Sequence, residues 1–215
     1  MKTYPLFLVN LDQVRAVVVG GGRVAARKVN GLHRADARIV VIAPELCHSL
    51  ERQLARGEID AVKRDYRLGD LDGAFLVIAA TDDPTINQQV WAEARALGLL
   101  VNVVDDPEHC NFIAPSVVRR GPLTLAISTS GRCPALSRHI RGELEGDFGA
   151  AYGQFVDLLG ELRAETVVAL SMAERRIFWR KIFESDVLAL LDDGDELGAR
   201  RLAWSILDRY LSGAA

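Results

Sequence analysis

Three glycines directly follow a short run of β-branched residues near the start of the chain. Residues 16–20 read AVVVG, an unbroken apolar run typical of a strand buried on both faces of a parallel sheet. Residues 23–34 then place Val24, Val29 and Leu32 at helical spacing, and residues 37–44 form a second β-branched run. This strand–helix–strand unit constrains the fold strongly, because parallel strands need a crossover connection between them.

The same alternation continues to about residue 113. Apolar and amphipathic patterns predict further strands over residues 60–66, 74–83 and 99–106 and helices over residues 50–59 and 84–98. Strands and helices that alternate in this way predict an α/β fold of the Rossmann type, with an open, doubly wound, mostly parallel sheet.

The pattern changes after residue 113. Two strand-like stretches joined by RRGP predict a β-hairpin within residues 112–131, and nearly all of the chain from residue 133 onward is helical in character. Ser171 and Glu174 stand at the spacing of a capping box. We therefore predict a Rossmann domain at residues 1–113, a β-rich linking segment at residues 114–145 and a helical C-terminal domain at residues 146–215.

The glycines match a dinucleotide-binding fingerprint. Gly20, Gly22 and Ala25 follow the order G-x-G-x-x-A, in which the small residues allow a tight turn, close approach of a pyrophosphate and close packing of helix on strand. The motif follows a predicted strand and opens a predicted helix, which is the context that the pattern requires. The alternative is a structural turn that binds no ligand.

The second strand ends in APE, which places Glu45 slightly beyond the position of the acid that holds an adenine ribose. No arginine follows at once, so the sequence favours NAD over NADP. Glu45 as a solvated loop residue remains an equal alternative.

Polar residues follow the next two buried strands. Because ligands bind beyond the carboxyl ends of strands in such sheets, we expect Thr81 and Asp82 to border the cofactor. Asn102, Asp105 and Asp106 would approach its reactive end. Asp82 and Asp83 suit a helix cap or a turn equally well, since they precede the helix predicted to begin at Pro84.

Positive charge is concentrated in one segment. The chain has a net charge of −3, yet residues 109–142 contain five arginines and no Asp or Glu. The overall charge argues against nucleic acid as a partner, and Phe112 is the only aromatic residue of the segment that could stack on a base. The arginines suit either recognition of substrate carboxylates or ion pairs across a dimer interface.

Other features narrow the class of protein. No apolar run approaches the roughly 18 residues of a membrane span, and the first residues lack the features of a signal peptide, so we expect a cytoplasmic protein without a membrane partner. The three cysteines lie far apart, which suits a reducing compartment. Cysteine and histidine spacing predicts no structural metal site.

Four motifs together resemble the precorrin-2 dehydrogenase family, also called the siroheme synthase N-terminal module. They are VVVGGGRVAARKV, VIAATDDPTINQQV, NVVDDPEHCNFIAPSVVRRGPLTLAISTSGRCPALSRHIR and MAERRIFWRKIF, and they extend over nearly the whole chain. The resemblance implies an NAD-binding Rossmann domain, dimerisation through the β-rich segment and following helices, and oxidation of precorrin-2 to sirohydrochlorin. It also implies that ferrous iron is a possible further substrate.

The resemblance assigns roles to individual residues. Asp105 matches the family's catalytic aspartate, and we expect it to act as a general base or electrostatic partner. Ser128 and Thr129 occupy the family's serine-rich turn on the substrate side, where Thr129 replaces the more usual serine. Asp105 and His109 are the candidates to assist iron insertion.

From the glycine loop, the strand ends and the resemblance, the expected cofactor-binding residues are Gly20, Gly22, Arg23, Val24, Ala43, Pro44, Glu45, Ala80, Thr81 and Asp82. The expected substrate-binding residues are Asn102, His109, Ser128, Thr129, Arg132 and Arg138. An alternative function is that of an NAD-sensing regulatory module without catalysis.

Overall fold

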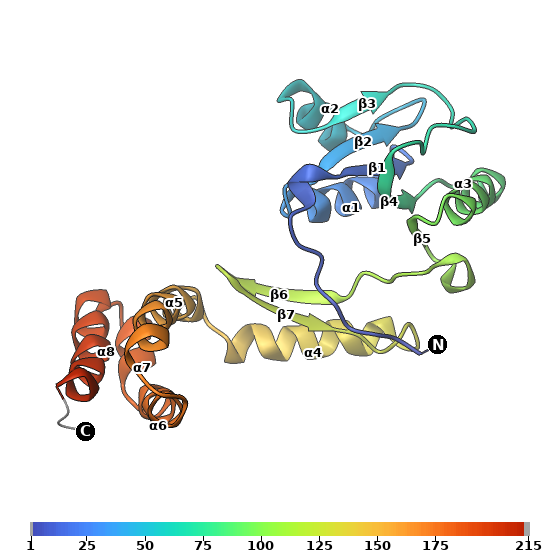
Figure 1. The fold of residues 1–215 in the computed structure, drawn as a ribbon. Coiled ribbons are helices and arrows are strands. Elements are labelled where there is room, and N and C mark those ends of the chain that lie inside the picture. Colours follow the sequence, from blue (N-terminus) through green and yellow to red (C-terminus); the bar gives the residue numbers. More distant parts are fainter. Residues whose placement is uncertain (1, 213–215) are drawn as a thin grey trace. The chain divides into compact units, whose positions relative to one another are not determined.

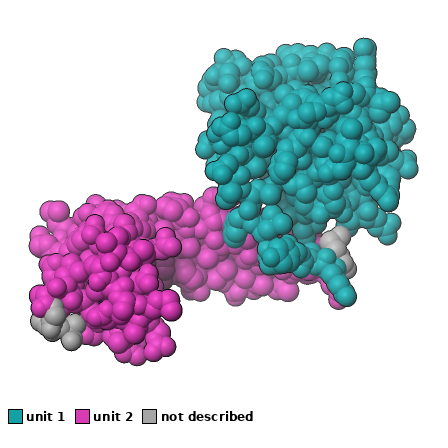
Figure 2. Space-filling model, in the orientation of Figure 1, with its two compact units in different colours: residues 1–114 teal, residues 115–215 magenta. Residues whose placement is uncertain are grey.

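The computed structural model describes residues 2–212 of the chain. The chain divides into two compact units, residues 1–114 and residues 115–215, which Figure 2 shows in teal and magenta. The predicted division of the second unit at residues 145 and 146 stays a prediction, as do the other domain boundaries.

The first unit contains a five-stranded sheet with the strand order β3-β2-β1-β4-β5 (Figure 1), and every neighbouring pair is parallel. The strands are β1 (Arg15–Val19), β2 (Arg38–Ile42), β3 (Asp60–Val62), β4 (Ala74–Ala79) and β5 (Leu100–Val103). This order confirms the predicted Rossmann-type fold. It reverses direction at β1 and β4, so the ligand crevice of such a sheet lies at the carboxyl ends of these two strands.

Three helices cover the two faces of this sheet. They are α1 (Arg23–His33), α2 (His48–Ala55) and α3 (Pro84–Ala96), and two short 3-10 turns, η1 (Leu11–Gln13) and η2 (Pro107–His109), complete the unit. Val29 of α1 and Leu50 of α2 pack with Val18 and Val41 on one face, whereas Val90 of α3 packs on the other face. Residues that alternate along β1 enter opposite cores, which explains why the strand is apolar from Ala16 to Val19.

The second unit starts with the predicted hairpin. Strands β6 (Ser116–Arg120) and β7 (Leu123–Ile127) pair antiparallel, and Gly121 adopts a positive φ of 53° in the turn. Helix α4 (Pro134–Asp147) follows. Elements β6 and β7 both contact α4.

Four further helices build a separate core in this unit. They are α5 (Ala151–Ala169), α6 (Met172–Phe183), α7 (Val187–Asp192) and α8 (Glu196–Leu211). Leu162, Phe178 and Leu207 are buried at its centre. The predicted capping box at Ser171 and Glu174 is present at the start of α6. No helix within residues 2–212 combines the length and the apolar character that crossing a membrane requires.

Candidate functional site

The three glycines after β1 have three different roles. Gly20 has φ +123°, and a Cβ atom there would lie 2.3 Å from the carbonyl oxygen of Ala80. A Cβ atom on Gly21 would lie 1.8 Å from the carbonyl oxygen of Glu45, so this glycine allows the loop after β2 to pack against the glycine loop. Nothing lies within 4 Å of a Cβ atom on Gly22. Protein backbone therefore occupies the space beside the first two glycines, whereas the space at Gly22 is open to a ligand.

Helix α1 begins at this open position without a side-chain cap. Gly22 is its N-cap residue, and no described side chain accepts a hydrogen bond from the first backbone N–H groups of the helix. Helix α3 differs, because Asp83 Oδ1 accepts from the backbone N–H of Thr85 at 2.7 Å. Uncapped N–H groups and the helix dipole give the start of α1 the character that suits an anion. Arg23 and Val24, the first residues of α1, are exposed at this end.

Backbone hydrogen bonds join the carboxyl ends of the strands. Gly20 N donates to Ile42 O at 2.9 Å, Ala80 N to Val19 O at 2.8 Å, and Val104 N to Ala79 O at 2.9 Å. The loops that follow β1, β2, β4 and β5 are therefore tied to one edge of the sheet. This edge carries the residues that the sequence assigns to the cofactor.

Two of these loops border the glycine loop directly. After β2, Ala43 is buried, whereas Pro44 and Glu45 are exposed. After β4, the hydroxyl of Thr81 bonds to Asn87 Oδ1 at 2.9 Å, and Asp82 is exposed. The helix cap is formed by Asp83.

A buried hydrogen-bond network lies at the end of β5. Asn102 is 6% exposed, and its Oδ1 accepts from Lys28 Nζ of α1 at 3.1 Å. Its Nδ2 donates to Cys110 Sγ at 3.4 Å and to Phe112 O at 3.1 Å. The amide of Asn102, a predicted substrate residue, is thus engaged within the protein. Lys28 was not singled out from the sequence. Its position next to Val29, which the structure buries, was a signal that the lysine side chain would be partly buried.

Asp105 lies in the loop after this network. It is exposed and has a positive φ of 59°, a backbone conformation that Asp tolerates better than most residues. The neighbouring Asp106 Oδ2 lies 2.6 Å from His109 Nδ1, and the ring of His109 packs edge-on against Trp91 with 4.4 Å between centroids. The loop is therefore held on both sides of the exposed Asp105 carboxylate.

A cavity of about 320 Å³ lies at this end of the sheet. It is lined by Pro84, Asn87 and Gln88 of α3, by Val103 and Val104, and by Asp106 and His109. Polar groups from α3 and from the loop after β5 therefore share one hollow at the predicted reactive end.

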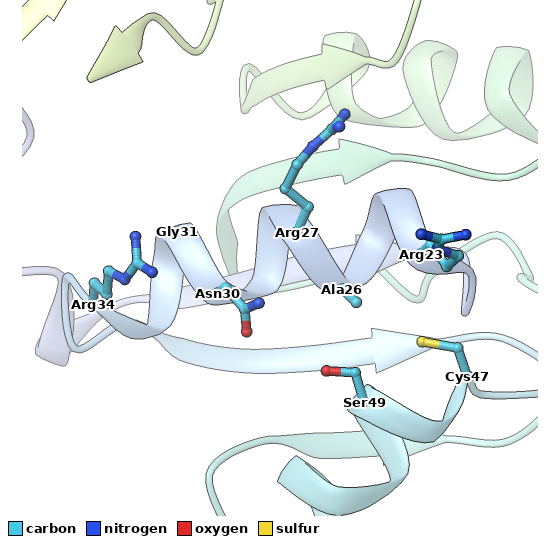
Figure 3. A pocket seen from close by; sticks show the side chains of 8 residues that line it. All are labelled: Arg23, Ala26, Arg27, Asn30, Gly31, Arg34, Cys47 and Ser49. Atoms are coloured by element: carbon cyan, nitrogen blue, oxygen red, sulfur yellow. The ribbon is translucent and has the colours of Figure 1, made fainter. Parts of the chain in front are cut away.

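A second cavity of about 370 Å³ follows α1 on its side toward α2. Figure 3 shows Arg23 at the end of α1 near the glycine loop, with Cys47 and Ser49 of the adjoining segment opposite the helix. Arg27 and Arg34 also line it. This cavity lies along the helix and not at the strand ends, so the smaller cavity is the one at the predicted reactive end.

The remaining predicted substrate residues lie in the second unit. Ser128 Oγ accepts from Ser130 N at 3.0 Å, and Thr129 Oγ1 accepts from Cys133 N at 3.0 Å, directly before α4. Arg132 and Arg138 are exposed.

Other arginines of the basic segment are engaged within the protein. Arg120 donates to Phe148 O at 2.7 Å and to Glu145 O at 2.8 Å. Arg141 forms an ion pair with Glu145 at 3.4 Å. The five arginines are thus unequal: Arg120 and Arg141 bond within the second unit, whereas Arg119, Arg132 and Arg138 are exposed to solvent.

Comparisons with known proteins agree with this architecture. Residues 7–116 match the family model described as putative NAD(P)-binding, residues 120–146 match the sirohaem biosynthesis protein central model, and residues 151–207 match the sirohaem synthase dimerisation region. The solved structure titled SirC, precorrin-2 dehydrogenase, is similar to this chain, with a TM-score of 0.77 and 25% sequence identity. The similarity covers 97% of this chain and 100% of that chain.

Curated relatives are similar over the same length. The siroheme synthase of Azotobacter vinelandii is 41% identical over 216 residues, which cover 100% of this chain and 46% of that protein. The siroheme synthase of Photorhabdus laumondii is 43% identical over 195 residues, which cover 90% of this chain and 41% of that protein. The chain thus spans less than half the length of these relatives. It belongs to the putative NAD(P)-binding family, and the residues that follow match the central and dimerisation regions of sirohaem synthase proteins.

Proposed function

We propose that the chain oxidises precorrin-2 to sirohydrochlorin, with NAD as the hydride acceptor. The observation that carries the proposal is the open space at Gly22 beside the uncapped start of α1, on the same sheet edge as Asp105. The similarity to SirC, precorrin-2 dehydrogenase, supports the choice of substrate.

The residues at this edge fit a dinucleotide. The pyrophosphate would lie against Gly22 and the first N–H groups of α1, and Arg23 adds a positive charge there. The adenosine would lie beside Pro44 and Glu45, and the loop at Ala80, Thr81 and Asp82 would form the opposite wall.

Glu45 supports NAD as the preferred form. A carboxylate at the end of β2 can accept hydrogen bonds from a ribose hydroxyl, whereas it repels a 2′-phosphate. Residues 46–49 contain no arginine that would offset this repulsion.

The reaction removes a hydride and a proton from the tetrapyrrole. When bound, the nicotinamide supplies the hydride acceptor. The exposed carboxylate of Asp105 would receive the proton or stabilise the positive charge that develops on the substrate. Asp105 and Asp106 are adjacent carboxylates. The side chain of Asp106 is bonded to His109, whereas Asp105 is exposed.

The second unit would complete the enzyme. Arg132 and Arg138 are exposed and suit the carboxylates on the rim of the substrate, which Ser128 and Thr129 would also contact. The match of residues 151–207 to a dimerisation region supports a homodimer. Insertion of ferrous iron stays a prediction, with Asp105 and His109 as its candidate residues.

An anaerobic assay tests the proposal. Purified protein is mixed with precorrin-2 and either NAD or NADP, and the absorbance of the reduced nicotinamide is followed. We expect NADH to form, and NADPH to form much more slowly. Binding of NAD without any turnover of precorrin-2 would favour the sensing module instead.

A further inference from the structure

Lys28 is a partly buried cation at the predicted reactive edge of the sheet. Neither the packing of the fold nor the proposed cofactor site explains why a lysine lies there. It belongs to α1, the helix whose first residues are proposed to hold the pyrophosphate, and its ammonium group donates to Asn102 Oδ1 at 3.1 Å. Burial lowers the pKa of Lys28, and Arg27 lowers it further. The carboxylate of Asp105, and Cys110 once its thiol ionises, act in the opposite direction and favour the charged amine.

The partner of Lys28 passes this restraint to the loop that carries Asp105. Both N–H groups of the Asn102 amide are engaged, one with Cys110 Sγ and the other with Phe112 O. Cys110 Sγ in turn lies 3.2 Å from Val103 N and 3.2 Å from Asp106 O. These contacts tie both ends of the loop at residues 104–110 to one amide group.

A lysine suits this position for two reasons. Its long stem reaches from a helix to the end of a strand, and its ammonium group places a compact positive charge there. A partly buried amine that only filled space would be unfavourable, because burial disfavours its charged form. The titratable groups that act on Lys28 are Arg27 on its own helix and, after β5, the carboxylate of Asp105 and the thiol of Cys110.

We propose that Lys28 is a positioning residue for the dehydrogenation: its ammonium group, bonded to Asn102, fixes the loop that carries Asp105 relative to the cofactor helix and keeps a positive charge beside Asp105. The proposal rests on the proposed function for its catalytic meaning. Its geometric part, the link from α1 to the loop, is measurable in the protein alone.

The first test uses one substitution and a matched control. Lys28→Met removes the charge and the hydrogen bond, and we expect kcat to fall by roughly 10- to 100-fold, because a small displacement of a reacting group has an effect of this size. The dissociation constant for NAD should stay within about twofold, because the first turn of α1 is unchanged. Lys63→Met is the matched control, since Lys63 bonds to Glu51 on the surface of the same unit. Its kcat should equal that of the wild type.

The second test is the pH profile of Lys28→Arg. In the wild type, kcat should decline as the pH rises. The decline should begin below the ordinary lysine pKa of about 10.4, because the pKa of Lys28 is lowered. A guanidinium group stays charged at every pH of the assay, so Lys28→Arg should keep most of the activity and lose this decline. Burial raises the pKa of the Cys110 thiol, and this thiol is still present in Lys28→Arg. A decline caused by Cys110 would therefore persist in the variant.

Wild-type kcat in Lys28→Met, or an unchanged alkaline decline in Lys28→Arg, would overturn the proposal. Amide hydrogen exchange of residues 104–110 in the absence of substrate separates this failure from failure of the proposed function. Faster exchange in Lys28→Met than in Lys63→Met supports the link even if precorrin-2 is not a substrate. Equal exchange in the two variants contradicts it.

Discussion

Substitution of Gly22 by Asp should stabilise the protein and prevent cofactor binding at the same time. Gly22 is the N-cap residue of α1 with φ −81° and ψ −174°, a conformation that Asp adopts readily, and a Cβ atom there meets no other atom within 4 Å. The new carboxylate would cap free N–H groups of the helix and interact favourably with its dipole. Together these effects contribute about 0.5 to 1 kcal/mol. The melting temperature without cofactor should rise by roughly 1 to 4 °C.

The same carboxylate would occupy the space and the hydrogen-bond donors proposed for the pyrophosphate. Two like charges about 4 Å apart repel by about 4 kcal/mol at the effective dielectric constant of a protein surface. Even half of this repulsion raises the dissociation constant for NAD about 30-fold. Gly22→Asn is the matched control, because it caps the helix with a similar shape and no charge, and its affinity should lie between those of the wild type and Gly22→Asp.

Titration calorimetry with NAD and thermal unfolding of the apo protein check these expectations together. A Gly22→Asp variant that binds NAD with the wild-type dissociation constant would refute the assignment of the loop. A variant with weak binding but a lower melting temperature would show that the loop was damaged, and would refute the reasoning on the helix cap.

Three further predictions concern separate parts of the chain. Asp105→Asn should lower kcat strongly. The affinity for NAD and the melting temperature should be kept, because Asn also tolerates the positive φ of this position. Unchanged kcat would remove Asp105 from the mechanism. Arg138→Ala should raise the KM for precorrin-2 about tenfold or more, whereas Arg120→Ala should leave KM unchanged and lower stability, since Arg120 bonds to backbone carbonyl groups; steady-state kinetics and denaturant unfolding distinguish the two outcomes. Tyr66→Phe should lower the free energy of unfolding by about 1 to 3 kcal/mol, because it deprives the buried carboxylate of Glu93 of a hydrogen-bond donor, and a loss near zero in urea unfolding would contradict this.

The arrangement of strands and helices was predictable because it depends on local patterns. The apolar runs at β1, β2 and β4, the proline that opens α3 and the capping box of α6 are all short-range signals, and each element forms where its signal lies. The hairpin of β6 and β7 likewise follows from the RRGP turn, in which Gly121 supplies the positive φ.

The hydrogen bonds and close contacts within the site were not predictable, because they join residues that are distant in sequence. Lys28 and Asn102 are 74 residues apart, and only the folded sheet brings them together. The need for glycine at position 21 similarly depends on the backbone of Glu45. The sequence identified which residues lie at the strand ends, but not which of their side chains are bonded within the protein.

The basic segment shows the same limit. Its lack of acidic residues made five arginines look equivalent, yet Arg120 is fixed by the backbone carbonyl groups of Phe148 and Glu145. The acid that pairs with Arg141, Glu145, lies just beyond the segment. Counting charges along the chain could not distinguish these structural arginines from the exposed ones.

The most direct test of the central claim is the stoichiometry of the anaerobic reaction. Removal of one hydride and one proton from each precorrin-2 predicts equimolar NADH and sirohydrochlorin, with neither product formed when NAD is omitted. Formation of sirohydrochlorin at the same rate without NAD, or no consumption of precorrin-2 by protein that binds NAD, would contradict the account.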